Sequence, residues 1–317
     1  MGASMAGEET GAKKSDVRSL VLSAGGVDVA AVRALMARDV PSGYRARTAD
    51  EIFDDYWRWF RRLRLMEIVG VLGLAAVALI AGMLGYMVWY FVLLGLAILS
   101  AVLFRSVVGQ RELSITEIIT QDCDSAKWRR FMELYDERNR RGFVRRRIAC
   151  NIAAADYADG RYADAIRRLA SISVGERSAL WATILNTRAL SLYWLGDQEA
   201  AEQALRSAQE FRDRFARSRA AKAAAASVCE SVEQRLRPVE TWDASDLALI
   251  VRRLEGAQAH NERASWCLRL AEYELAHGDI EVARQLLDEK VLSPMTPAMR
   301  RSRDELLHDV EARMQGR

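Results

Sequence analysis

A run of 37 residues without a charged side chain, from Ile68 to Phe104, dominates the hydrophobic pattern of the chain. One helix of that length would reach about 55 Å, whereas the hydrocarbon core of a bilayer is about 30 Å thick. Tilting cannot absorb that excess, but two spans of roughly 18 residues each would fit. The pattern therefore predicts a transmembrane helical hairpin over residues 65–105, with helices at 66–83 and 87–105 and a turn near Gly82 and Gly85.

The charges that flank this run predict its orientation. Arginines precede the first span and follow the second, whereas the turn between them carries no charge; they are Arg58, Arg61, Arg62, Arg64, Arg105 and Arg111. By the positive-inside rule, both ends of the hairpin then lie in the cytoplasm. We therefore expect a multi-pass protein of the cell membrane with two spans and both termini cytoplasmic. The alternative, a buried helical pair in a soluble core, is disfavoured because no polar face interrupts the run.

Two further features of the spans bear on their packing. Glu67 stands one turn after Arg64 and close to the returning Arg105, which predicts an ion pair at the membrane interface. Small residues also recur four positions apart, a spacing that lets helices approach closely. They either pack the two spans on each other or let the hairpin self-associate into a homo-oligomer; the pairs are Ala78 and Gly82, Ala81 and Gly85, and Ala97 and Ala101.

The segments around the hairpin predict cytoplasmic helices. Residues 1–64 show short helical patterns, and Thr48 with Glu51 has the spacing of a capping box. The helix that begins there carries Phe53, Tyr56 and Trp57, continues into the arginines and runs on to the membrane. This composition predicts an amphipathic interfacial helix with its aromatic side chains among the headgroups and its arginines on anionic lipid. Residues 106–142 predict further juxtamembrane helices.

The region from residue 143 to residue 317 contains an internal repeat. Gly160, Gly196 and Gly278 each follow one amphipathic stretch and precede another. This arrangement predicts a tight helix–helix turn with a left-handed glycine. An alanine follows each glycine by five residues, where two packed helices would cross most closely; these alanines are Ala165, Ala201 and Ala283.

This pattern resembles the tetratricopeptide repeat, TPR. As in that family, a small residue stands seven before each glycine (Ala153, Ala189 and Ala271) and a large apolar residue nine after it (Leu169, Leu205 and Leu287). The family's aromatic residue four before the glycine is replaced by Asp156, Leu192 and Glu274. The resemblance implies an all-α chain in which the membrane hairpin is followed by a TPR-like α-solenoid. Four helical pairs would extend to about residue 291, with 212–237 and 241–257 as the third pair and a capping helix at 298–315.

The resemblance also implies a binding surface. In the family, the first helix of each pair lines a concave face, and that placement is carried over here by position. Asn151 and Asn186 are notable because asparagine is poor in helix interiors, so they either hold the backbone of a bound peptide or are ordinary polar positions. The candidate partner-binding residues are Arg147, Asn151, Tyr157, Thr183, Asn186, Thr187, Tyr193, Trp194, Arg269 and Glu272.

The charge balance and the motif content of the sequence restrict the classes of function that we expect. Lys+Arg number 46 against 43 Asp+Glu, so no global field attracts nucleic acid, and we expect no nucleic-acid partner. The arginine-rich stretch from Arg138 to Arg147 then predicts contact with anionic lipid or a solvated helix face. The four cysteines are widely spaced, and phosphate-loop, nucleophile-elbow and zinc-helix motifs are missing from the sequence. We therefore expect no enzyme activity, no cofactor and no metal.

A membrane-tethered scaffold is the leading functional hypothesis. The hairpin would hold a cytoplasmic TPR-like array at the inner leaflet, where it recruits an unidentified protein or peptide and contacts anionic lipids. The alternative is an oligomeric membrane-structural or pore-forming element whose helical domain is an assembly collar. Arginine outnumbers lysine 41 to five, which is typical of GC-rich coding in bacteria.

Overall fold

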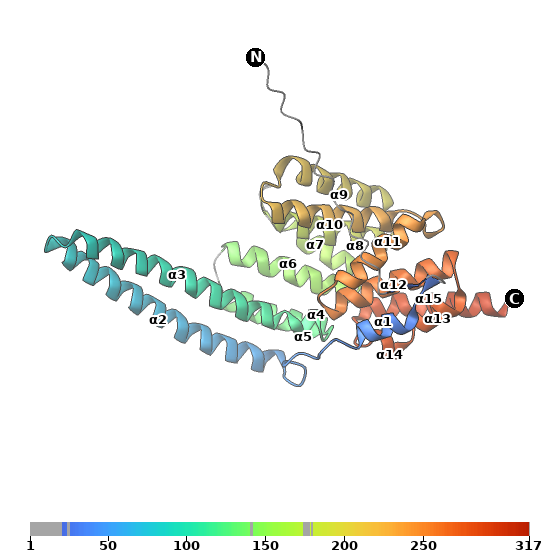
Figure 1. The fold of residues 1–317 in the computed structure, drawn as a ribbon, viewed down its shortest axis with the longest axis horizontal. Coiled ribbons are helices and arrows are strands. Elements are labelled where there is room, and N and C mark those ends of the chain that lie inside the picture. Colours follow the sequence, from blue (N-terminus) through green and yellow to red (C-terminus); the bar gives the residue numbers. More distant parts are fainter. Residues whose placement is uncertain (1–20, 24–25, 140–141, 174–177, 179, 317) are drawn as a thin grey trace, which may run out of the picture.

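The computed structural model describes residues 21–23, 26–139, 142–173, 178 and 180–316. Most of these residues are helical, which confirms the all-α prediction, and the strands among them form one two-residue antiparallel pair near the N-terminus. Two long helices project as a hairpin from a body of shorter helices (Figure 1). The elements are β1 (Leu22–Ser23), β2 (Gly26–Val27), α1 (Val29–Met36), α2 (Ala49–Met83), α3 (Met87–Ile115), α4 (Glu117–Thr120), α5 (Ser125–Arg138), α6 (Gly142–Ala158), α7 (Tyr162–Ala170), α8 (Leu180–Trp194), α9 (Gln198–Glu210), the π-helical turn η1 (Phe211–Phe215), α10 (Arg219–Leu236), the 3-10 turn η2 (Val239–Thr241), α11 (Ala244–Gly256), α12 (His260–His277), α13 (Ile280–Leu286), α14 (Glu289–Leu292) and α15 (Pro297–Gln315).

The hairpin consists of α2 and α3, joined by a turn at the place that the sequence predicts. Gly85 in this turn has a φ of 82°, a left-handed conformation that glycine adopts without a steric penalty. Ala78 and Ala97 are buried within the hairpin, so small residues do pack the two helices on each other. Large apolar side chains on the outer surface remain exposed, including Leu79 at 62% and Val88 at 75%. Both helices are long and apolar enough to cross a membrane.

The helix that the capping box of Thr48 and Glu51 begins is present and runs on into the first span, as the sequence predicts, without a break to Met83. The predicted position of its aromatic side chains is wrong. Phe53 and Tyr56 are each 1% exposed and pack on aromatic side chains of α5, so they do not lie among headgroups. The sequence could not show that α5 would cover this aromatic face, since the two helices are about 80 positions apart.

The repeat alanines lie where the sequence places them. Ala165, Ala201 and Ala283 are fully buried, and α6 packs with α7, α8 with α9, and α12 with α13. Gly160 and Gly196 are left-handed, with φ of 73° and 78°, as predicted. Gly278 is not: its φ is −124°, and the Glu274 side chain fills the space that a Cβ would occupy. Glu274 also accepts a hydrogen bond from the Asp279 amide at 3.2 Å, so a carboxylate supports this turn.

The predicted third pair is also different. The helix expected over 212–237 begins only at Arg219, where Ser218 caps it, because η1 ends the preceding helix in a π-helical turn. Then α10 packs on α8 and α9, whereas α11 packs on α12. The two meet mainly through side chains, such as Glu230 of α10 with Arg252 at 3.5 Å. The array is therefore divided at α10–α11 into two packed groups.

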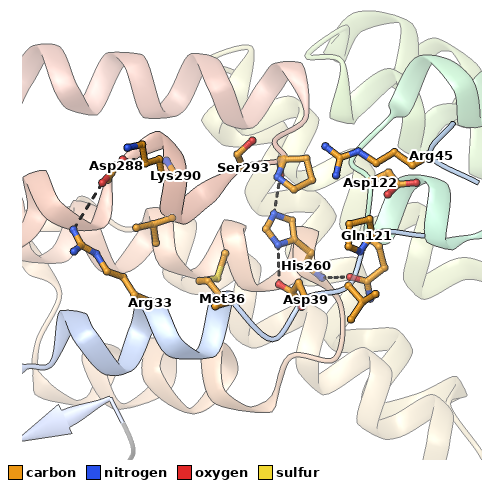
Figure 2. Close-up of a pocket in the computed structure, with 15 residues that line it drawn as sticks. Arg33, Met36, Asp39, Arg45, Gln121, Asp122, His260, Asp288, Lys290 and Ser293 are labelled. Atoms are coloured by element: carbon orange, nitrogen blue, oxygen red, sulfur yellow. Dashed lines mark hydrogen bonds and ion pairs between the residues drawn. The ribbon is translucent and has the colours of Figure 1, made fainter. Parts of the chain in front are cut away.

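The N-terminal segment is built into the C-terminal group. α1 packs on α12, α13 and α14, so its apolar side chains share one hydrophobic core with them. His260 fixes the chain that follows α1 (Figure 2). Its Nδ1 lies 2.7 Å from Asp39 Oδ2, and its Nε2 lies 2.8 Å from the Pro294 carbonyl oxygen. Residues before and after the hairpin therefore form one folded unit.

The last helix closes the array. α15, the capping helix that the sequence predicts, packs on α12 and α13 through Leu306, Leu307 and Val310. It also reaches α6, and Arg301 donates a hydrogen bond to the Asp159 carbonyl oxygen at 2.8 Å. The Arg301 guanidinium occupies the space beside Gly160, where a side chain would collide with it. The end of the chain thus packs against the first helical pair.

Candidate functional site

A groove of about 520 Å³ lies between the first helices of the repeats, and we call it the central groove. Its walls come from α6, α8, α10, α12 and α15, and the end of α3 with α4 and α5 borders it on the membrane-hairpin side. The closing contact of α15 with α6 makes this a recess rather than an open face. Polar side chains from several helices line it, together with a few aromatic rings.

Eight of the ten candidate residues from the sequence line this groove. Two do not. Tyr193 packs in a hydrophobic cluster with Leu192 and Ala201, and Arg147 lies toward the hairpin in a different cavity. The lining candidates are Asn151, Tyr157, Thr183, Asn186, Thr187, Trp194, Arg269 and Glu272.

Arg235 holds one wall of the groove together. It forms an ion pair with Glu272, and its side chain is 11% exposed. Its guanidinium also lies over the Trp194 ring at 4.8 Å from the centroid, a cation–π arrangement. Trp194 stacks in turn on Tyr162 with centroids 6.1 Å apart. A charged and aromatic layer therefore replaces ordinary apolar packing between α8, α10 and α12.

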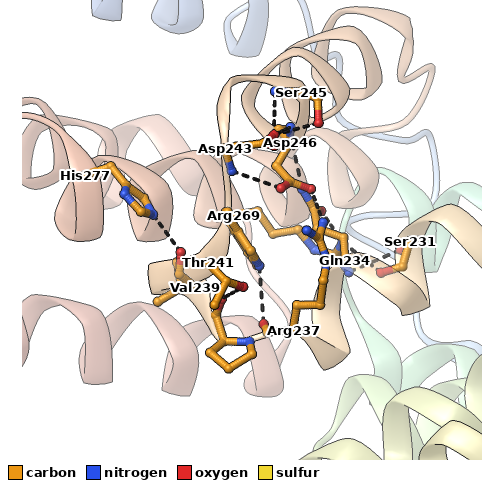
Figure 3. A network of polar contacts seen from close by, with 12 residues as sticks. Ser231, Gln234, Arg237, Val239, Thr241, Asp243, Ser245, Asp246, Arg269 and His277 are labelled. Carbon is orange, nitrogen blue, oxygen red and sulfur yellow. Dashed lines mark hydrogen bonds and ion pairs between the residues drawn. The ribbon is translucent and has the colours of Figure 1, made fainter.

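Arg269 is the second buried cation at the groove, 8% exposed. It donates to the Ser231 carbonyl at 3.2 Å, to Gln234 Oε1 at 3.0 Å and to Ser231 Oγ at 3.2 Å, all of them neutral acceptors. Figure 3 shows this network beneath the start of α11. The guanidinium also lies 4.5 Å from the centroid of the Trp266 ring. The direct contacts of the Arg269 guanidinium are thus dipoles and a ring, and the Glu272 carboxylate acts on it only at longer range.

The two arginines differ in their electrostatic surroundings. Burial lowers the pKa of Arg269, and the nearby Arg235 charge lowers it further, to about 9. Burial acts in the same direction on Arg235, but the Glu272 carboxylate, together with Tyr193 and Tyr157, more than offsets it, so the pKa of Arg235 is raised. The arrangement therefore holds two positive charges and one negative charge at one side of the groove. Two positive charges that lie close together in a buried site repel each other, so the surrounding fold must hold them in place.

The groove also offers uncharged hydrogen-bonding groups. Asn151 of α6 and Asn186 of α8 are half-buried at its edge, and Asn261 of α12 lines it as well. The Asn151 amide donates to the Met132 sulfur at 3.9 Å, which is a long and weak hydrogen bond. Primary amides offer both donors and an acceptor, which matches the needs of an extended peptide backbone.

Sequence reasoning missed several lining residues. Asn261 and Ser265 stand two turns and one turn before Arg269, so i, i+4 spacing places all three on one helix face. This spacing identifies Asn261 and Ser265 from the sequence once Arg269 is a candidate. Arg235 cannot be identified in this way, because the sequence predicts that its helix pairs with the helix at 241–257. Ser302 and Leu306 of α15 line the groove only because the last helix returns to α6.

Comparison of the chain with known protein families, curated proteins and solved structures finds no match.

Arg147 belongs to a second polar cluster, at the base of the hairpin. Its Nη2 lies 2.6 Å from Glu112 Oε2, and the other carboxylate oxygen accepts from the hydroxyls of Tyr56 at 3.2 Å and Tyr135 at 3.1 Å. Burial raises the pKa of both tyrosines, so their hydroxyls stay protonated as donors. The Glu112 carboxylate thereby links α3 to α2, α5 and α6.

A third polar cluster is centred on Asp156, a residue for which the TPR resemblance implies no role. It replaces the aromatic residue of the family pattern and is fully buried. Its carboxylate pairs with Arg129 of α5, with Arg161 at 3.3 Å and with Arg168 at 3.1 Å. The first repeat is therefore held to α5 by a buried ionic cluster where the family would use an aromatic contact.

Proposed function

We propose that this protein is a membrane-tethered interaction module whose central groove binds an extended segment of a partner protein. The α2–α3 hairpin is the anchor, and the helical body carries the recognition surface. The gathering of eight candidate residues in one groove carries this proposal. The TPR-like solenoid is part of the same proposal, supported by the buried repeat alanines and by the left-handed glycines of the first two repeats.

The groove fits a peptide better than a small reactive substrate. Amides, hydroxyls and aromatic rings are spread along several helices, which suits contacts with successive residues of an extended chain. Rings such as Trp194 give large contact area with few rotatable bonds, a property of residues that dominate binding energy.

Cytoplasmic placement of both termini is also proposed. The arginines that flank the hairpin support it, as does the packing of α1 on α12 to α14, because one folded core cannot be divided by a membrane. The alternative, an oligomeric pore or membrane-structural element, has less support. Ala78 and Ala97 are already covered within the hairpin, which leaves these two small residues unavailable to a second copy.

Topology can be tested on the full chain. A reporter that is active only in the cytoplasm should work when fused to either terminus. A cysteine placed at Gly85, which has open space beside it, should react with a membrane-impermeant reagent from outside the cell. Opposite locations of the two termini, or a protected cysteine at the turn, would contradict the hairpin topology.

The groove can be tested by site-specific photocrosslinking. A photoreactive residue at Asn186 should yield a defined crosslinked protein in intact cells. The double substitution Asn151→Ala with Asn186→Ala should weaken recovery of that same protein about tenfold, because two backbone-directed hydrogen bonds are lost. The melting temperature should stay nearly unchanged.

The matched control uses Gln203, an exposed residue on α9 away from the groove. A photoreactive residue there should not capture the partner, and Gln203→Ala should leave recovery intact. Equal capture from both positions, or full recovery with the double substitution, would remove the groove from consideration.

A further inference from the structure

A further cavity, of about 400 Å³, opens between α2 and α3 at the edge of the apolar run. Arg64 and Glu67 of α2 and Arg105 of α3 line it. Phe60 and Phe104 lie on one side, with centroids 6.3 Å apart, and aliphatic side chains continue from the cavity along the spans. The cavity therefore has a charged end and an apolar end.

The expected ion pair at this place does not form. Within the described part of the chain, no ion pair or hydrogen bond joins Glu67 to Arg64 or Arg105, although all three side chains line one cavity. The two arginines come from different helices, and they flank the charge-free stretch on both sides. Their charges are thus presented together at the depth where phospholipid headgroups would lie.

The net charge of the three ionisable side chains favours a ligand with one negative charge. Two guanidinium groups and one carboxylate leave a net charge of +1, which a phosphate diester with one negative charge would neutralise. Arginine recognises phosphate oxygens through paired N–H donors. The Glu67 carboxylate can then accept hydrogen bonds only, so it suits a headgroup that carries hydroxyl groups. Exposed aliphatic side chains such as Leu72, 64% exposed, extend the surface along which acyl chains would lie.

We infer that this cavity is a binding site for an anionic glycerophospholipid with a hydroxylated headgroup, of the phosphatidylglycerol type. The phosphate lies between Arg64 and Arg105, the headgroup hydroxyls donate to Glu67, and an acyl chain follows the groove between α2 and α3. The inference rests on the proposed membrane anchor and adds to it a defined lipid position at the base of the hairpin.

Lipid retention by the purified full chain tests the site. The protein is incubated in detergent with equal amounts of phosphatidylglycerol and phosphatidylcholine, and the lipids that remain bound after gel filtration are quantified by mass spectrometry. Wild-type protein should be enriched in phosphatidylglycerol. Arg64→Gln with Arg105→Gln should lower the ratio of phosphatidylglycerol to phosphatidylcholine about tenfold.

The matched control removes the same charge nearby. Arg61 and Arg62 are exposed on α2 and do not line the cavity, so Arg61→Gln with Arg62→Gln should change the ratio less than about twofold. Equal ratios in the two double variants, whether both high or both low, would overturn the inference. If the cavity variant fails to fold, Arg105→Gln alone replaces it, because Arg105 is exposed.

Phosphatidylmethanol tests the role of Glu67, since it keeps the phosphate charge but has no headgroup hydroxyl. Wild type should retain it less well than phosphatidylglycerol, and Glu67→Ala should retain the two equally. Carbonate extraction of cell membranes separates the two proposals. A chain that is extracted would refute the anchor and the lipid site together, whereas an embedded chain without lipid preference would refute the lipid site alone.

Discussion

Replacing Asp156 by alanine should lower the free energy of unfolding by about 3–5 kcal/mol, the range for breaking a buried ionic contact from one side. The substitution leaves three arginines without their common carboxylate, and Arg129 is itself only 17% exposed. Its charge would stay inside the interface of α5 with α6, with only the more distant Asp159 carboxylate, at 3.8 Å, as a partner. Thermal unfolding of the full chain in detergent, followed by circular dichroism, should show a decrease of about 10 °C.

Asp164 provides the control for this prediction. It lies on α7, is 43% exposed and forms one ion pair within its own helix, with Arg167 at 3.0 Å. Asp164→Ala should therefore change stability by less than about 0.5 kcal/mol. If both alanine variants melt at the same temperature as wild type, the buried cluster does not stabilise the first repeat.

Replacing Glu112 by alanine should destabilise the base of the hairpin by about 2–4 kcal/mol. Its carboxylate is the shared acceptor of the Tyr56 and Tyr135 hydroxyls and of Arg147. Without it, two largely buried hydroxyl groups lose an acceptor, and four helices lose their common contact. Because α2 and α3 enter the body at this point, limited proteolysis should also cut the α5–α6 region faster.

Glu112→Gln separates the hydrogen bonds from the charge. The amide oxygen can still accept from both tyrosines, and only the ion pair with Arg147 is lost. Since Arg147 is 41% exposed, that loss should cost about 1 kcal/mol or less. Equal destabilisation by both substitutions would mean that the ion pair, and not the tyrosine pair, holds the hairpin base.

Local patterns predicted much of the fold. The turn at Gly85, the capping box at Thr48 and the buried alanines of the repeats all depend on residues within one turn or one helical pair of each other. The groove residues could be predicted for the same reason, since first-helix positions follow from the repeat spacing. Tyr193 and Trp194 show the limit, because neighbouring helix positions point about 100° apart and only Trp194 lines the groove.

Contacts between distant segments could not be predicted. Covering of Phe53 and Tyr56 by α5, and packing of α1 on α12, join parts of the chain with no shared local pattern. Asp156 shows a second limit. A carboxylate in place of an aromatic residue looks like loss of the repeat pattern, and only the positions of Arg129 and Arg168 show that it is compensated.

The return of α15 to α6 has a consequence for how the helical body opens. In a linear repeat array each unit contacts only its neighbours, so the terminal units fray at low cost and stability declines toward the ends. Here the last helix is bonded to the first pair through Arg301 and Asp159, so neither end is a free boundary. Release of α15 would expose the first and last pairs at once, which joins their opening into one cooperative event.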